Sequence, residues 1–166
     1  METSYRVAHA KLDNPADQQA VLAMMNAYAS DPMGDGCPLS SYAHNHLIEG
    51  LRQHPTSLFF LAWDQNSQPI GIATCFRGFS TFSAKPTIQI SDFFVLPSHR
   101  GLGIGSLLMK AIEAEAIASK CCKMTLEVQE NNHVARSVYR RHGFHQAIYV
   151  AEAGGSLHLT KALPSS

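Results

Sequence analysis

The segment Val95–Ser106 reads VLPSHRGLGIGS and decides how the chain around it folds. It follows a strand-like run, Ile88–Val95, and precedes a segment with helical periodicity, Leu107–Ala118. The three alternating glycines at this junction remove side chains from the turn, so that backbone N–H groups can approach an anion closely. The helix that follows adds unpaired N–H donors and the positive end of its dipole. The pattern therefore predicts a binding site for a phosphate or diphosphate group.

Several kinds of glycine-rich loop are possible interpretations of this segment. A P-loop needs a lysine directly after its last glycine, and Ser106 stands there instead. A dinucleotide-binding loop needs the spacing G-x-G-x-x-G, but here Gly105 comes one residue early, although Glu127 could imitate the ribose-binding acid. A glycine-rich turn that binds nothing is the plain alternative. The remaining pattern starts at Arg100 and reads R-x-x-G-x-G.

Length and composition indicate a single domain over residues 1–166. The chain is 45% hydrophobic, which is enough for one substantial core. Its formal net charge is zero and it has no block of Lys or Arg, so binding to nucleic acid or to a membrane surface is not expected. No membrane span or signal peptide is expected either. The four cysteines match neither a zinc spacing nor a disulfide framework, which favours the cytoplasm and no metal site.

Hydrophobic periodicity predicts strands and helices that interleave around one sheet, an α/β (α+β) fold. The expected helices are Asp17–Ala29, a segment around Leu47–Leu51, Leu107–Ala118 and His133–Arg141. The expected strands are Tyr5–Ala10, Leu58–Trp63, Ile70–Phe76, Ile88–Val95, Met124–Val128, His145–Val150 and Ser156–Thr160.

A second informative pattern lies one strand after the glycine loop. Asn132 is placed to cap the helix that follows it, and Gly143 is placed to end that helix. Together with Ala135, Tyr139 and Phe144 these residues spell N-x-x-A…Y-x-x-x-G-F. In this order and spacing, the glycine loop and the second pattern resemble the two signatures of the GNAT N-acetyltransferase superfamily.

The resemblance implies a fold and a donor substrate. The fold is a mixed, mostly antiparallel sheet with about four helices and a V-shaped splay between its central strands. The donor is acetyl-coenzyme A, with the pantetheine arm bonded to main-chain groups of the splayed strand and the N–H of Val95 directed at the thioester oxygen. The residues expected to bind it are Phe94, Val95, Arg100, Gly101, Leu102, Gly103, Ile104, Gly105, Ser106, Asn132, Ala135 and Tyr139.

The resemblance also implies a catalytic pair, Tyr139 and Asp92. A primary amine of a small molecule would attack the thioester directly, and Tyr139 would protonate the leaving thiolate. A phenol with an ordinary pKa of about 10 lies above a thiol at about 8.5, so this transfer is downhill. Asp92 would act as a base through a water molecule, or else serve as a structural carboxylate that pairs across the sheet.

The segment Asp92–Val95, with the glycine loop, is most similar to the spermidine/spermine N-acetyltransferase branch and its bacterial relatives. Those polyamine enzymes carry a glutamate where this chain has Ser91, which argues against a polyamine acceptor. Asp31 and Asp35 either attract the acceptor amine or are ordinary turn residues. A degenerate domain that binds an acyl-coenzyme A without catalysis is the alternative function. By the habit of the superfamily a homodimer is expected.

Overall fold

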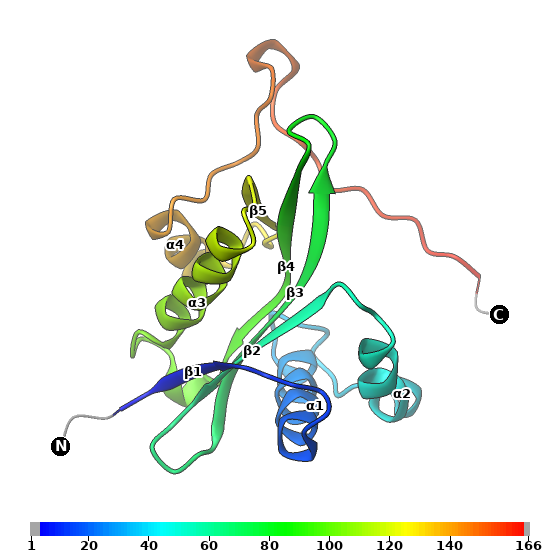
Figure 1. The fold of residues 1–166 in the computed structure, drawn as a ribbon, viewed down its shortest axis with the longest axis vertical. Coiled ribbons are helices and arrows are strands. Elements are labelled where there is room, and N and C mark those ends of the chain that lie inside the picture. Colours follow the sequence, from blue (N-terminus) through cyan, green and yellow to red (C-terminus); the bar gives the residue numbers. More distant parts are fainter. Residues whose placement is uncertain (1–3, 165–166) are drawn as a thin grey trace. The chain divides into compact units, whose positions relative to one another are not determined.

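The computed structural model describes residues 4–164, which form two compact units that divide between Gln129 and Glu130. The strands of the first unit are β1 (Arg6–His9), β2 (Ser57–Trp63), β3 (Pro69–Ser80), β4 (Lys85–Val95) and β5 (Lys123–Leu126). Its helices are α1 (Pro15–Ser30), α2 (Ser41–Arg52) and α3 (Ile104–Ala118), with a 3₁₀ turn at Pro97–His99 (Figure 1). The second unit contains α4 (His133–Arg141) and a 3₁₀ turn at Ala151–Ala153. That the chain is one domain stays a prediction.

The strands form one mixed sheet in the order β1-β2-β3-β4-β5 (Figure 1). Neighbours are antiparallel from β1 to β4, whereas β5 runs parallel to β4 because α3 carries the chain back across the sheet between them. β3 and β4 stay paired as far as Ser80 and Lys85, whereas β2 leaves β3 at Phe76. The expected α/β fold with a mostly antiparallel sheet and, within the described residues, four α-helices is confirmed.

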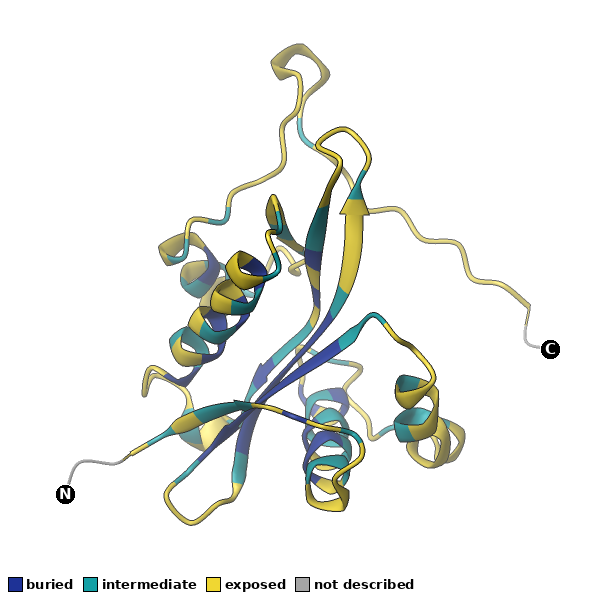
Figure 2. Cartoon of the chain, in the orientation of Figure 1, coloured by how far each residue is buried: buried dark blue, intermediate teal, exposed yellow. Residues whose placement is uncertain are grey.

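β2 is buried along nearly its whole length because helices cover both faces of the sheet (Figure 2). On one face Phe59, Leu61 and Phe94 pack in a cluster with Val21 and Met24 of α1. Helix α3 covers the opposite face. Its fully buried residues recur at helical spacing, and they are Ile104, Leu108, Met109 and Ile112.

Side chains cap three of the four helices, and the exception is α3. Asn14, Ser40 and Asn132 each accept a hydrogen bond from a backbone N–H in the first turn of α1, α2 and α4. The capping role predicted for Asn132 is therefore confirmed. Helix α3 instead follows Gly103, which has φ 83° and provides no side-chain acceptor. Gly103 therefore offers no side-chain acceptor to the first N–H groups of α3, which a helix cannot pair internally.

The two strands predicted at His145–Val150 and Ser156–Thr160 are wrong for the described chain. Between α4 and residue 164 the structure has only the short turn at Ala151–Ala153 and no strand. A backbone hydrogen bond from Ser156 N to Ala147 O, at 2.9 Å, connects the two segments. Their β-branched and aromatic residues produced the strand pattern, but most of these side chains are exposed, and a strand needs a paired neighbour as well as propensity.

Candidate active site

A β-bulge in β4 opens the sheet next to β5. Thr74 of β3 lies opposite Asp92, whereas the next residue, Cys75, lies opposite Ile90, so Ser91 is the extra residue. The parallel pairing with β5 ends at the same place, since Ile90 is the last residue of β4 that β5 matches. The four residues of β4 beyond the bulge therefore have β3 on one side and no β5 residue on the other. This is the splay that the resemblance implied.

The main chain of Val95 points into this opening. The N–H of Leu96 donates to the carbonyl of Ile70 at 2.9 Å, so this N–H points toward β3. The N–H and C=O of Phe94, two residues earlier, point to the same side. Because successive residues of a strand direct their N–H and C=O to opposite sides, those of Val95 face away from β3. The Phe94 side chain is buried and stacks on Tyr28 with ring centroids 5.4 Å apart. Of the two residues predicted to bind the pantetheine arm, Val95 thus directs its main chain toward the splay.

The glycine loop is shaped by backbone conformation and not by tight packing. Gly101 has φ 79° and Gly103 has φ 83°, both in the left-handed region that glycine adopts without strain. A Cβ at either position would meet nothing within 4 Å, so the space in front of the loop is open. Leu102 is exposed, whereas the Ile104 side chain is buried in the core, which leaves its main chain as the group available to a ligand.

The Arg100 side chain makes contacts within the protein. Its Nη2 donates to a carboxylate oxygen of Asp31 at 2.6 Å, and its Nε donates to the carbonyl of Val95 at 3.0 Å. The guanidinium also lies over the ring of Phe94, 5.6 Å from its centroid. The sequence gives no sign of the ion pair, because the two residues are far apart along the chain.

Asp31 is both a turn residue and a buried charge. One carboxylate oxygen accepts a hydrogen bond from Met33 N at 2.9 Å, the turn interaction anticipated for an aspartate in this loop. Burial alone would raise the pKa of the Asp31 carboxyl, but the hydrogen bonds from Met33 and Arg100 and the charge of Arg100 together lower it. The carboxylate is therefore ionised and engaged by the protein itself.

Asp92 is a partly buried carboxylate beside the bulge. It accepts a hydrogen bond from the Thr74 hydroxyl across the sheet, the structural pairing considered for it. Burial raises the pKa of the Asp92 carboxyl above its usual range, although the hydrogen bond from Thr74 opposes this effect. Burial also raises the pKa of the Tyr28 phenol, and the charges of Asp92, Asp31 and Asp35 add to that effect. Asp92 is therefore the carboxyl group that lies directly at the bulge.

The remaining predicted site residues lie in the second unit. The Asn132 side chain accepts a hydrogen bond from Ala135 N at 3.1 Å, so the two residues form the start of α4 together. Tyr139 is buried and contacts Phe144, with ring centroids 6.0 Å apart. Gly143 has φ 83° and ends the helix as predicted.

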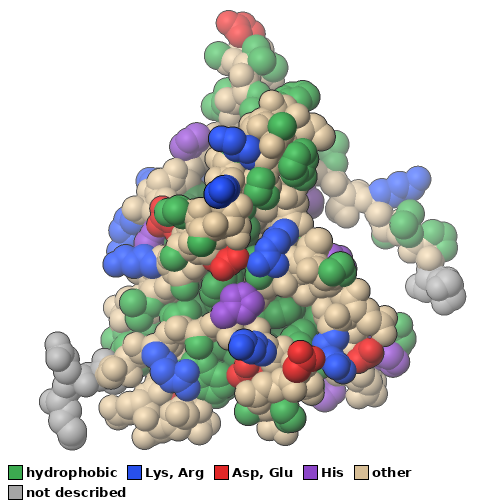
Figure 3. Space-filling model, viewed as in Figure 1, with side chains coloured by type: hydrophobic (Ala, Val, Ile, Leu, Met, Phe, Trp, Pro, Cys, Tyr) green, Lys and Arg blue, Asp and Glu red, His purple; other side chains and the backbone are tan. Residues whose placement is uncertain are grey.

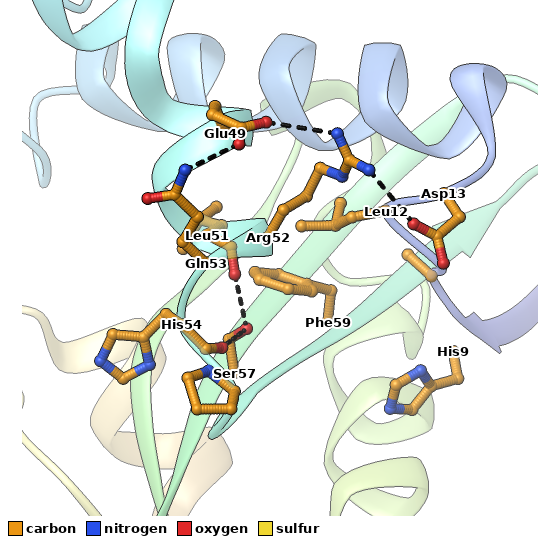
Figure 4. A pocket seen from close by; sticks show the side chains of 12 residues that line it. His9, Leu12, Asp13, Glu49, Leu51, Arg52, Gln53, His54, Ser57 and Phe59 are labelled. Carbon is orange, nitrogen blue, oxygen red and sulfur yellow. Dashed lines mark hydrogen bonds and ion pairs between the residues drawn. The ribbon is translucent and has the colours of Figure 1, made fainter.

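A pocket of about 410 Å³ lies elsewhere in the first unit, between the end of α2 and the start of β2 (Figure 4). Arg52 lies between two carboxylates there, 3.2 Å from Glu49 and 3.5 Å from Asp13. Leu12 and Phe59 line its apolar side. None of the predicted site residues borders this pocket.

No group of three His, Cys, Asp or Glu side chains among residues 4–164 could hold a metal ion. Within the same residues, every helix is too short or too polar to cross a bilayer. Charged side chains of both signs are interspersed on the face shown in Figure 3, in keeping with a formal net charge of zero.

A bulged strand that opens beside a parallel neighbour and runs into a glycine-lined helix start is the arrangement that the resemblance to acetyltransferases implied. The chain belongs to the acetyltransferase (GNAT) family, whose profile matches residues 21–144. An uncharacterised N-acetyltransferase of Bacillus subtilis, YhfO, is 28% identical over 137 residues, which are 79% of this chain and 85% of that protein. A thialysine N-epsilon-acetyltransferase of Bos taurus is 30% identical over 74 residues, 45% of this chain and 43% of its own.

A solved structure shows the same fold. The enzyme AAC(6')-Iy, in complex with the bisubstrate analogue CoA-S-monomethyl-acetylneamine, superposes with a TM-score of 0.72. The two chains are 17% identical, and the match covers 96% of this chain and 99% of the other. At this identity the likeness concerns the fold alone.

Proposed function

We propose that the protein transfers the acetyl group of acetyl-coenzyme A to a primary amine of a small molecule by direct attack. The observation that carries this proposal is the continuous path from the open edge of β4 at Val95 to the start of α3, which no side chain caps. An extended, amide-containing ligand that ends in a diphosphate fits such a path, because strand peptide groups can bond the amides and helix N–H groups the diphosphate.

The residues of the loop fit the donor. Positive φ at Gly101 and Gly103 turns the backbone toward open space, so that main-chain N–H groups from Gly101 to Ser106 would cradle the diphosphate. The N–H of Val95 would bond the thioester oxygen, where negative charge develops during attack. The resemblance assigns Asn132 and Ala135 to the same cofactor. A solved member of the fold holds a coenzyme A bisubstrate analogue, which supports this assignment.

The proposed catalytic groups are Asp92, Val95 and Tyr139. Asp92 would take a proton from the acceptor's ammonium group through a water molecule, so that the neutral amine can attack, and its raised pKa suits it to this task better than that of an ordinary aspartate. Val95 would stabilise the oxyanion, and Tyr139 would protonate the sulfur as coenzyme A leaves. No acyl-enzyme is needed, since the amine nitrogen bonds the acetyl carbon directly and the carbon–sulfur bond then breaks to release coenzyme A.

The acceptor is proposed as a small amine other than a polyamine. Ser91, the residue at the bulge, cannot hold a cation or accept a proton as the glutamate of the polyamine enzymes would. One relative is by its name a thialysine N-epsilon-acetyltransferase, and one solved structure holds a bisubstrate analogue of coenzyme A and acetylneamine, which supports an amine acceptor. The homodimer and the cytoplasmic location stay predictions.

Tyr139→Phe is expected to lower kcat by about 100-fold or more while coenzyme A binding is retained, because the phenol acts on the leaving thiolate and not on the diphosphate. The assay is thiol release from acetyl-coenzyme A with a panel of amino acids, aminoglycosides, polyamines and peptide N-termini. Tyr42→Phe, at an exposed tyrosine of α2, is the matched control and keeps wild-type rates. If no amine in the panel releases thiol from the wild-type protein, the domain binds acyl-coenzyme A without catalysis and the proposed function fails.

A further inference from the structure

The ion pair between Arg100 and Asp31 differs from the other ion pairs of the described residues. Its N–O distance is 2.6 Å, and the Asp31 side chain is only 5% exposed. The carboxylates of the other pairs are 27% to 94% exposed. Exposed pairs contribute little to stability, whereas a buried carboxylate that loses its partner is costly. This pair therefore fixes the two side chains strongly.

Arg100 connects this fixed carboxylate to the splayed end of β4. Its Nε bonds the Val95 carbonyl at 3.0 Å, and the N–H of the same peptide group, on Leu96, bonds Ile70 O at 2.9 Å. Both the C=O and the N–H of the peptide between Val95 and Leu96 are therefore hydrogen-bonded. Below the guanidinium lies the ring of Phe94, the residue just before Val95. Arg100 therefore contacts the chain on both sides of the N–H group that the proposed reaction needs.

The loop that carries Asp31 is rigid enough to serve as an anchor. It folds back on the end of α1, where Gly34 N donates to Asp31 O at 2.8 Å and Asp35 N donates to Ala29 O at 3.0 Å. Cys37 N adds a second bond to Ala29 O at 3.2 Å. Since these bonds lie within one segment, the anchor does not depend on a bound ligand.

We propose that Arg100 is a positioning residue that acts through Val95, and not a ligand of the diphosphate. Asp31 neutralises its charge and holds the guanidinium against the strand, so that the Arg100–Asp31 pair aligns the oxyanion-binding N–H with the glycine loop. This proposal rests on the proposed function and replaces the direct cofactor contact that the sequence suggested for Arg100. It also gives the loop after α1 a role in the transfer step.

A truncated donor separates the two roles of Arg100. S-acetylpantetheine carries the thioester and the pantetheine arm but lacks the diphosphate. If Arg100 acts through Val95, Arg100→Lys lowers kcat by about 10-fold or more with both acetyl-coenzyme A and S-acetylpantetheine. The reason is that a lysine ammonium cannot reproduce the guanidinium's simultaneous bonds to Asp31 and to the Val95 carbonyl. If Arg100 binds the diphosphate, the loss is confined to the KM for acetyl-coenzyme A, and the proposal is overturned.

Asp31→Asn also separates the two roles of Arg100, because one role predicts a loss of activity and the other predicts tighter binding of the donor. A positioning pair predicts a lower kcat, since the guanidinium is no longer held. A diphosphate ligand predicts a lower KM for acetyl-coenzyme A, since the guanidinium becomes available to the anion. Arg77→Lys is the matched control, because it alters a more exposed arginine–carboxylate pair, with Glu115, and leaves both parameters unchanged.

A spectroscopic measurement keeps this proposal separate from the proposed function. In Arg100→Lys the ¹³C resonance of the Val95 carbonyl is expected to shift, because the carbonyl loses its hydrogen bond, while the remaining spectrum stays that of a folded protein. An unchanged Val95 carbonyl overturns the proposal whether or not the wild-type protein releases thiol. Absence of thiol release from the wild type with every amine would instead overturn the proposed function alone.

Discussion

Gly34→Ala is expected to cost about 3 kcal/mol of folding stability and most of the acetyl-transfer activity. A Cβ at Gly34 would lie 2.2 Å from the carbonyl oxygen of Tyr28 and 3.2 Å from that of Ala29. These are backbone atoms at the end of α1, which cannot move without opening the helix. The loop would therefore leave α1, and Asp31 would be withdrawn from Arg100. Urea unfolding measures the first effect, and kcat for the best amine of the panel measures the second.

Gly36→Ala, in the same loop, is the control for this prediction. Gly36 has φ 72°, but a Cβ there would meet nothing within 4 Å. The cost is then only that of a left-handed alanine, about 1 kcal/mol, and activity is largely kept. If Gly34→Ala were as stable and as active as Gly36→Ala, the packing of this loop on α1 would have no role in the site.

Asp92→Asn is expected to raise the stability at neutral pH and to lower kcat by about 100-fold or more. Burial disfavours the ionised form of Asp92, and an amide of the same shape removes that cost while it still accepts the hydrogen bond from Thr74. The amide cannot take a proton from the attacking amine. A gain in stability together with a loss of activity would show that the Asp92 carboxylate serves catalysis and not folding. Unchanged kcat in Asp92→Asn would leave Asp92 a structural carboxylate only.

The pH dependence of folding stability follows from the raised pKa of the Asp92 carboxyl. The folded pKa of Asp92 lies above the unfolded one, so the native state binds the extra proton between the two pKa values. Stability therefore falls as pH rises through this window, and Asp92→Asn removes that slope. Glu115 is the control, because hydrogen bonds from Ser119 and Arg77 outweigh burial and lower its pKa. Glu115→Gln should lose a little stability at neutral pH, show a weaker loss of stability toward acid and keep its activity.

The sequence predicts most of this fold because its central elements are strongly periodic. The helix expected at His133–Arg141 is found with the same bounds, and β4 and α3 flank the glycine loop as expected. Helix α1 begins earlier than its apolar pattern, because Asn14 caps it and proline suits the first helical position. The strands expected near the C-terminus are wrong, since propensity alone does not provide a partner strand.

The candidate site is predicted only where a local pattern marks it. Glycines with positive φ and a helix start are properties of neighbouring residues, and the loop around Gly101 and Gly103 is found as expected. The pair of Arg100 with Asp31 depends on how a loop after α1 packs against β4, and no spacing in the chain encodes that distance. The bulge at Ser91 is likewise visible only in the register of β3 and β4.

Titration of ¹⁵N-labelled protein with coenzyme A tests the central claim most directly, because it reports where the donor binds without requiring an acceptor. The proposed site predicts the largest amide shift changes at Val95 and from Gly101 to Ser106. Changes confined to the pocket around Arg52, or no changes at millimolar coenzyme A, would contradict the assignment of this loop as the diphosphate site.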